Sequence, residues 1–291
     1  MTEIDAAVDE WLAALILESL GPSTFRGLAP PGRRKRTFGG MAMGQALVAA
    51  AHDVATDRHT PQSVHCEFVR AGDPQLPIDF DVTPTSAGRR FATRTVIAHQ
   101  ADGVLFTVLV RFHTDDDGPD FQAAVPAEAP APESLPDFPT HLAPHTDKVP
   151  DWASGNSPID MRVIDEGDAT AQRSWVRIGG GSTAVRVSGA VGVSVVGACG
   201  LLYAGDMTLI GTAPTPFGRA WSDDGVSIAS LDHAMWLHRP FDIDEWLLYD
   251  QRVLSVAGSR ALARGEMYTA DGRLVATVMQ NGLVDLPASP S

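Results

Sequence analysis

The chain is poor in cysteine and in long apolar runs. Cys66 and Cys199 are the only cysteines among 291 residues, and both lie among small and apolar neighbours. Such sparse cysteine is typical of a reducing compartment and excludes a cysteine-based metal site. We therefore predict a cytoplasmic protein in which both thiols are reduced, buried and not nucleophiles. The acidic N-terminal segment and the lack of an apolar run of about 18 residues predict neither a secretory signal nor a membrane span.

Basic residues are also few. Lys and Arg total 22 against 36 Asp and Glu, which gives a formal net charge of −14. A chain with this balance repels nucleic acid and anionic membranes except at a local basic patch, so neither is expected as a partner. One basic run is present, made of Arg33, Arg34, Lys35 and Arg36. We interpret it as a solvated turn, with contact to the phosphates of a ligand as the alternative.

An internal repeat organises the rest of the chain. Arg70 and Asp73 recur 169 positions later as Arg239 and Asp242. An Ala-Gly-x-Arg motif and an Asp-Gly motif then follow in the same order in both copies. Because 44% of the residues are hydrophobic, the chain can bury a substantial core, and the repeat predicts a duplicated domain.

Each copy combines one buried helix with several strands. Segments 44–53 and 197–206 are small and apolar on nearly every face, which is typical of a buried helix. Asp-Gly at 102–103 and at 271–272 predicts hairpin turns. The predicted fold class is therefore α+β, with a helix followed by an antiparallel meander in each half. Strands are expected at 64–70, 78–83, 92–99, 104–113, 172–178, 228–239, 247–256, 261–269 and 274–286.

The two halves are expected at residues 12–115 and 160–286. An acidic, proline-rich linker at 116–159 joins them, and its prolines predict an extended, solvated chain without a helix. Common enzyme motifs are incomplete, since Ser194 lacks the second glycine of a nucleophile elbow. The nine histidines show no metal-binding spacing, and we predict no metal and no cofactor.

Four segments, 38–46, 64–73, 228–241 and 245–249, carry a family likeness. The third contains the long and specific motif Leu-Asp-His-x-Met-Trp-x-His-Arg-Pro-Phe. With these segments the chain resembles the acyl-CoA thioesterase II family from about residue 12 to residue 286. The resemblance implies a double hotdog, in which two fused halves each wrap an antiparallel sheet around a long central helix. It also implies a homo-oligomer, a dimer or tetramer of double hotdogs.

The resemblance further implies the reaction. The family hydrolyses acyl-CoA to a free carboxylic acid and CoA, a step of fatty acid and lipid metabolism, without a covalent enzyme intermediate. By position, the residues that hold the attacking water become Asp206, Ser230 and Gln280. Asp206 is then the general base, and the two neutral side chains orient the water. Many relatives have Thr in place of Ser230, and its β-branch stiffens χ1.

The start of the first helix is the predicted oxyanion site, formed by the backbone N–H groups of Gly40 and Met41. For the basic run 33–36, the resemblance makes the phosphates of CoA the ligand of the alternative interpretation. His65 is either a residue of the substrate cleft or, in the preferred interpretation, a hydrogen-bonded core histidine. Structural pairing is expected for the charged residues of the third segment, Asp232, His233, His238 and Arg239.

The two copies differ at the predicted catalytic set. Asp53 corresponds to Asp206 by helix spacing, but Gln280 corresponds to Arg111 when the count starts at the Asp-Gly turn. We therefore predict one active site per chain, built by the second half with help from the first.

Two other functions stay open. A hotdog-fold enoyl-thioester hydratase or dehydratase needs a histidine and an acid at the substrate, and His52–Asp53 is the candidate pair. A non-catalytic acyl-CoA binding protein is the other alternative, although the intact set of Asp206, Ser230 and Gln280 argues against it.

Overall fold

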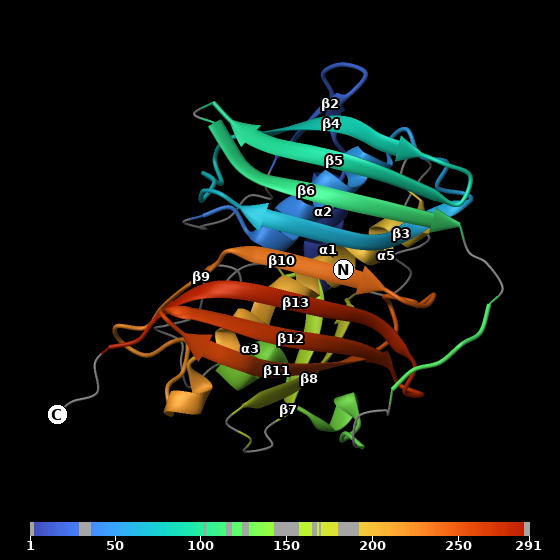
Figure 1. The fold of residues 1–291 in the computed structure, drawn as a ribbon. Helices are drawn as coiled ribbons and strands as arrows, with labels where there is room; N and C mark the ends of the chain where they lie inside the picture. The colour runs from blue at the N-terminus through green and yellow to red at the C-terminus, as the bar shows by residue number, and fades with distance from the viewer. Residues whose placement is uncertain are drawn as a thin grey trace.

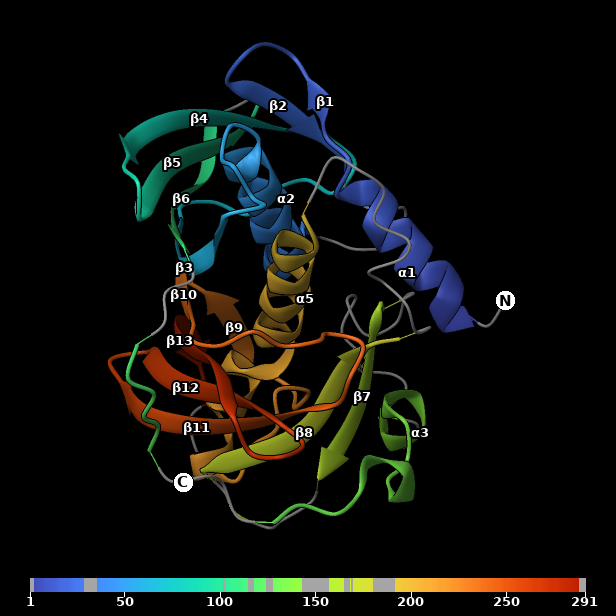
Figure 2. The ribbon, with the colours of Figure 1, turned by 90° about the vertical axis from the view of Figure 1, so that its right-hand side faces the viewer.

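The computed structural model describes residues 3–28, 36–101, 103–114, 118–123, 128–142, 157–164, 168, 170–179 and 192–287. These residues form one antiparallel sheet of 13 strands that curves around two central helices (Figures 1 and 2). The first half contains α1 (Glu3–Ala14), β1 (Glu18–Ser19), β2 (Thr24–Gly27), α2 (Gly39–Ala51), β3 (His59–Phe68), β4 (Ile78–Ala87), β5 (Phe91–Gln100) and β6 (Gly103–Thr114).

The second half repeats this plan with longer connections. Its linker holds η1 (Pro132–Ser134) and α3 (Phe138–Leu142). The remaining elements are β7 (Ile159–Ile164), β8 (Ala171–Ile178), α5 (Val193–Thr208), η3 (Ile210–Thr212), η4 (Thr215–Phe217), β9 (Ser227–Ser230), β10 (Asp232–Leu237), β11 (Leu247–Ala257), β12 (Arg260–Thr269) and β13 (Leu274–Asp285).

The order of the strands is symmetric about the middle of the sheet. It runs β1-β2-β4-β5-β6-β3 from one edge and continues β10-β13-β12-β11-β8-β7, while β9 pairs with β13. β6 and β13 therefore occupy equivalent places, each beside a central strand. The two central strands β3 and β10 pair with each other, with His65 opposite Ala234 at the middle of their ladder. We call this β3–β10 ladder the seam, and it joins two pseudo-twofold-related halves into one continuous sheet.

Helices α2 and α5 pack against each other inside the curved sheet, as Figure 2 shows. The Cys199 thiol of α5 donates a hydrogen bond to the carbonyl oxygen of Gly44 in α2 at 3.3 Å. Nearly every residue of both helices is buried, as their apolar composition predicted. Both thiols are free and buried, as expected.

One expectation about apolar runs is wrong. The segment Val193–Phe217, which includes α5, is by length and composition apolar enough to cross a membrane. In the fold, 78% of its apolar window is buried inside the protein. A helix that is apolar all round is buried in either setting, and here α2 and the sheet cover it.

The linker also differs from its prediction. It contains the five-residue helix α3, and Pro139 lies in the first turn, where a helix tolerates the missing N–H. Leu135 packs against a small apolar cluster that includes Trp175 and Leu248. The indole N–H of Trp175 donates to the carbonyl oxygen of Pro130 at 2.8 Å. This part of the linker is therefore folded onto the second half.

Most expected strands are present, with three differences. The expected strand at 228–239 is two strands, β9 and β10, because the ladder is interrupted at Leu231. The edge strands β1, β2 and β7 and the helix α1 have no counterpart among the expected elements. α1 is amphipathic enough to contribute Val8, Trp11 and Leu15 to the core.

The turn between the last two strands is one residue longer in the second half. Four residues, 100–103, separate His99 of β5 from its partner Val104 of β6, whereas five residues, 269–273, separate the equivalent partners Tyr268 of β12 and Leu274 of β13. Counted across this difference, Gln280 corresponds to Val110. Both side chains are fully buried, whereas Arg111 is exposed on the other face of the sheet. The expected match of Gln280 with Arg111 is wrong by one residue, and in a strand such a slip reverses the face.

Candidate active site

Three predicted side chains meet where the end of α5 approaches the start of α2. The side-chain amide of Gln280 donates from Nε2 to Oδ1 of Asp206 at 2.7 Å and to Oγ of Ser230 at 2.9 Å. The second carboxyl oxygen of Asp206 accepts a hydrogen bond from the backbone N–H of Gly40 at 2.8 Å. The fold therefore brings together Asp206, Ser230 and Gln280, which come from α5, β9 and β13.

Two glycines allow α2 to approach Asp206 this closely. A Cβ atom at Gly39 would lie 2.8 Å from Oδ2 of Asp206, and one at Gly40 would lie 2.8 Å from Cα of Tyr203 in α5. The contact at Gly40 would be with backbone, which real Cβ atoms do not tolerate, and the contact at Gly39 would be with the carboxylate itself. The paired glycines at the start of α2 are therefore needed for its N–H groups to reach the carboxylate.

Burial dominates the acidity of Asp206. Its side chain is 6% exposed, and loss of solvation raises its pKa from 3.8 to about 7. The hydrogen bonds from Gln280 and from the Gly40 N–H act in the opposite direction, because they stabilise the ionised carboxylate. The result is a carboxyl group that exchanges its proton near neutral pH, which is what a general base requires.

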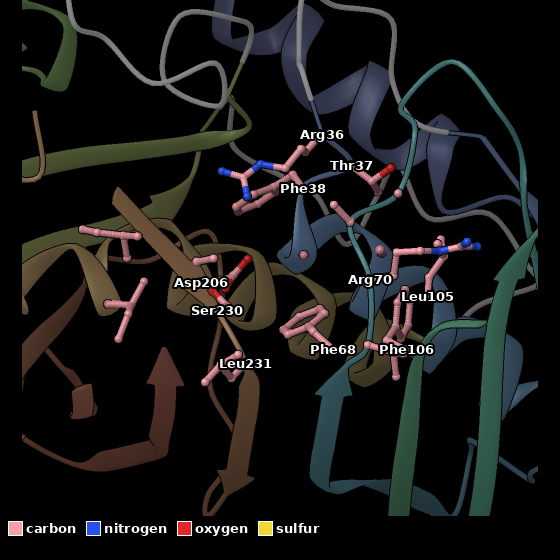
Figure 3. Close-up of a pocket in the computed structure, with 18 residues that line it drawn as sticks. Arg36, Thr37, Phe38, Phe68, Arg70, Leu105, Phe106, Asp206, Ser230 and Leu231 are labelled. Carbon is pink, nitrogen blue, oxygen red and sulfur yellow. The ribbon is translucent and has the colours of Figure 1, made fainter. Parts of the chain in front are cut away.

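A pocket of about 420 Å³ opens at this carboxyl group. Asp206 and Ser230 form part of its wall, and Figure 3 shows them together, with Phe68 and Phe106 of the first half nearby. Most of the remaining lining is apolar, with Ala42, Phe68, Leu105, Phe106, Ile210, Ile228 and Leu231 among it. Both halves therefore build the pocket, although the acid belongs to the second.

The pocket lining contains more basic than acidic residues, whereas the whole chain has a net negative charge. Its described lining contains Arg36 and Arg70 but a single acid, Asp206. Arg70 is held in place by a hydrogen bond from Nη2 to the carbonyl oxygen of Gly103 at 3.0 Å. Sequence reasoning did not select Phe68 or Arg70, although both lie in segment 64–73, which carried the family likeness.

Three of the predicted site residues, Gln280, Gly40 and Met41, do not line the pocket. Gln280 is fully buried and does not line the pocket, so it contacts Asp206 and Ser230 from behind. The N–H of Gly40 is directed at Asp206, so it is not available as the predicted oxyanion donor. Met41 is 2% exposed and is not a lining residue, whereas Gly39 is.

His65 is not part of the site. It lies between the buried residues Val64 and Cys66 of β3, so its side chain points to the outer face of the sheet. There its ring packs edge-on against Trp236, with centroids 4.9 Å apart. Of the basic run, Arg36 lines the pocket, while the predicted contacts of Arg33, Arg34 and Lys35 lie outside the described residues.

In the first half, the acid that corresponds to Asp206 is paired with an arginine. Asp53 is half exposed and forms an ion pair with Nε of the buried Arg94 at 2.8 Å. Pro61 occupies the position equivalent to Ser230, because each residue precedes an interruption of its strand. Pro61 pairs with Phe112, two residues after Val110, and Ser230 pairs with Gly282, two residues after Gln280. The first half therefore keeps the acid but has neither the hydroxyl nor the amide.

Three of the four charged or titratable residues of segment 228–241 have polar partners in the structure. Asp232 accepts a hydrogen bond from the backbone N–H of Asn281 at 3.0 Å, and His238 bonds to Oγ1 of Thr277 at 2.8 Å. Arg239 forms an ion pair with Asp120 of the linker. These three have structural partners, as expected. Within the part of the chain that the structure describes, the ring of His233 has no hydrogen-bond partner, and its Nδ1 lies 3.8 Å from Oδ1 of Asp206, which the sequence did not reveal. Among the described residues, no group of three or more His, Cys, Asp or Glu could hold a metal ion.

Comparison with known proteins gives a consistent result. A family profile described as acyl-CoA thioesterase matches residues 145–283, and one described as acyl-CoA thioesterase N-terminal domain matches residues 29–113. Acyl-coenzyme A thioesterase 8 of Homo sapiens is 34% identical over 93% of this chain and 87% of its own length. Acyl-CoA thioesterase 2 of Haemophilus influenzae is 30% identical over 93% of this chain and 95% of its own.

A solved structure confirms the double-hotdog fold. The acyl-CoA thioesterase II TesB2 from Mycobacterium marinum matches with a TM-score of 0.77 and 34% identity, covering 98% of this chain and 99% of that one. The likeness thus spans both halves and the linker between them. Sequence and fold together show that the chain belongs to the acyl-CoA thioesterase family and is a thioester hydrolase.

Proposed function

We propose that the chain hydrolyses acyl-CoA with a water molecule held by Asp206 and Ser230, while Gln280 fixes both side chains from behind. The observation that carries this proposal is the single amide of Gln280, which donates to both side chains at the wall of the pocket. A general base must lie within hydrogen-bond reach of its water and have a pKa near the working pH. Asp206, with its pKa raised to about 7 by burial, meets the second condition.

The hydrolysis needs no covalent bond between the enzyme and the acyl group. The water oxygen attacks the thioester carbonyl carbon while its proton passes to the carboxylate of Asp206. The tetrahedral intermediate then expels the sulfur of CoA, which takes the proton back as the C–S bond breaks. The products are the carboxylic acid and CoA. The N–H of Gly39, at the first turn of α2 and on the pocket wall, replaces Gly40 as the candidate donor to the oxyanion.

The pocket lining supports an acyl-CoA substrate. Aromatic and aliphatic side chains such as Phe68 and Phe106 suit an acyl chain, because burying apolar surface is favourable. Arg36 and Arg70 suit the phosphates of CoA and oppose the negative charge of the chain as a whole. The hydratase alternative has less support, because Asp53 is paired with Arg94 and the ring of His52 packs on Phe25.

Free-thiol release from short-, medium- and long-chain acyl-CoA tests the proposal. We expect thiol to appear in step with free acid. An enoyl-CoA arm, followed by loss of the conjugated double bond, detects water addition instead. Binding of acyl-CoA without thiol release would contradict hydrolysis and support a binding protein.

The arginine contact is tested separately. Arg36→Gln should raise the KM for acyl-CoA several-fold and leave kcat within about twofold, because a phosphate contact far from the reacting carbon binds substrate and transition state equally. The matched control is Arg260→Gln, at an exposed arginine that begins β12 and does not line the pocket. With an acyl thioester of N-acetylcysteamine, which lacks the phosphates, the KM of both variants should equal that of the parent. An unchanged KM for acyl-CoA would remove Arg36 from the site.

A further inference from the structure

His233 occupies an unusual place on the inner face of β10. It is fully buried and pairs across the seam with Cys66 of β3. On its other side, the register that pairs Ala234 with Met279 continues to place His233 beside Gln280. A Cβ atom at Gly205, the residue before Asp206, would lie 3.5 Å from Cε1 of the ring. The imidazole is therefore packed directly behind the acid and the amide of the active site.

Neither ring nitrogen of His233 has a hydrogen-bond partner among the described residues. A buried polar group without a partner costs free energy and is rare in folded proteins, so it requires an explanation. Oδ1 of Asp206 lies 3.8 Å from Nδ1 of the ring. That separation is too long for a hydrogen bond but close enough for a strong dipole–charge interaction in a buried site.

The ring is neutral, because burial lowers the pKa of His233 to about 3. A neutral imidazole carries its proton on one nitrogen, and the other nitrogen keeps a lone pair. A lone pair on Nδ1 would repel the ionised carboxylate of Asp206, whereas an Nδ1–H group would attract it. Only the second tautomer helps Asp206 to act as a base.

Of the described groups around His233, Asp206 has a pKa that burial raises to about 7. From β3, the Cys66 thiol stays protonated because burial raises its pKa well above the usual range. From β11, burial likewise raises the pKa of Tyr249, whose hydroxyl donates to the carbonyl oxygen of Gly205 at 3.0 Å. From α2 and β13, the N–H of Gly40 and the amide of Gln280 are neutral. The carboxyl group of Asp232 points to the N–H of Asn281, and Glu67 lies exposed across the seam.

We propose that His233 is a positioning residue whose Nδ1–H faces Oδ1 of Asp206 and stabilises its ionised form. This inference rests on the proposed function, in which ionised Asp206 takes the proton of the water. The ring then supplies a third stabilising dipole beside those of Gln280 and Gly40. Like Gln280, it is fully buried and does not line the pocket, so it does not touch the substrate.

Two isosteric variants separate this role from simple packing. The amide nitrogen of Asn extends as far from the backbone as Nδ1 of histidine, whereas that of Gln extends farther, toward the place of Nε2. His233→Gln should shift the acidic limb of the pH profile of kcat/KM upward by roughly one unit, because the ionised form of Asp206 loses a dipole. His233→Asn should keep the limb within about 0.3 unit of the parent.

The outcomes are distinguishable. If both variants lower kcat at every pH and leave the limb in place, His233 only packs and the proposal is wrong. Thermal unfolding confirms that each variant is folded. The ¹⁵N chemical shifts of His233 in the unmodified protein give a second test that needs no variant. A neutral Nδ1–H tautomer throughout the neutral range is expected, and an Nε2–H tautomer would overturn the proposal. If the unmodified protein releases no thiol from acyl-CoA, the proposed function itself fails.

Discussion

The two halves of the chain build the same arrangement of strands around the same kind of helix, yet their inward-facing residues differ at the decisive places. At the position of Ser230 the first half has Pro61, and at the position of Gln280 it has Val110. Beside Gln280 the neighbouring strand carries Ala263, whereas beside Val110 it carries Arg94. The scaffold was therefore kept in both halves, and the polar set is complete in one.

The same residue type behaves differently in the two settings. The side chain of Asp53 is 48% exposed and its oxygen is occupied by a guanidinium, whereas that of Asp206 is 6% exposed and bonded to neutral donors. Desolvation without a cationic partner is what raises the pKa of Asp206 to about 7. The first half contributes to the site in another way, since Phe68, Phe106 and Gly39 line the pocket.

The sharpest test of this contrast exchanges each acid for its amide. Asp206→Asn keeps the size and removes the base, so kcat on one medium-chain acyl-CoA should fall by roughly 10²- to 10⁴-fold. Asp53→Asn is the matched control and should change kcat by less than a few-fold. Steady-state thiol release measures both, with circular dichroism to check folding. Equal damage from the two variants would mean that both halves hydrolyse.

Stability should depend on pH through Asp206. Because its pKa in the folded protein is raised from 3.8 to about 7, the folded state binds this proton more tightly than the unfolded chain. Protonated Asp206 therefore contributes to the free energy of unfolding in full below about pH 4, and this contribution is lost as the pH rises through 7. The total loss in the free energy of unfolding is on the order of 4 kcal/mol. Urea unfolding at pH 5 and pH 8.5 should show the part of this loss that falls above pH 5, about 2–3 kcal/mol, in the parent and a smaller one in Asp206→Asn. Parallel losses would assign the effect to other groups.

Exchanging Gln280 and Val110 tests the amide itself. Gln280→Val installs the residue of the first half and should cost about 1–3 kcal/mol of transition-state stabilisation. It should also raise the midpoint of the acidic limb, because the hydrogen bond from Gln280 lowers the pKa of Asp206. Val110→Gln buries an amide at a fully buried, apolar position, so it should lower stability while kcat stays unchanged. A midpoint that does not move in Gln280→Val would reduce Gln280 to a packing role.

The smallest effect is expected at Ser230. Ser230→Thr keeps the hydroxyl that accepts from Gln280 and adds one methyl group, so kcat should stay within about threefold. Ser230→Ala is the control that removes the hydroxyl, and it should be clearly slower on the same substrate. If both variants match the parent, the hydroxyl of Ser230 has no part in holding the water.

Much of the fold was predictable because its signals are local and repeated. The apolar segments 44–53 and 197–206 fall on α2 and α5, and the Asp-Gly turns fall on real hairpins. The meeting of Asp206, Ser230 and Gln280 was predictable only through the family resemblance, because residues 50 and 74 apart along the chain give no local signal. The cytoplasmic location and the homo-oligomeric state stay predictions.

The parts that sequence reasoning missed depend on register and tertiary contact. A turn that is one residue longer moved the counterpart of Gln280 from the exposed Arg111 to the buried Val110. The side chain of His65 points to the outer face of the sheet because its neighbours Val64 and Cys66 are buried. The alternation of residues in the sequence does not show which of the two faces is buried. Likewise, nothing in the sequence near Gly40 shows that its N–H reaches Asp206 in the other half.

The seam has a consequence for the history and handling of this chain. Each half alone would present the bare backbone of β3 or β10 and one uncovered apolar helix, and such edges pair with other chains. A single half could therefore exist only as a dimer of identical copies, with two equal sites. Fusion into one chain makes the partner permanent and frees the two copies to change independently. One half can therefore carry Pro61 and Val110 in place of the serine and the glutamine while the other half keeps a complete site.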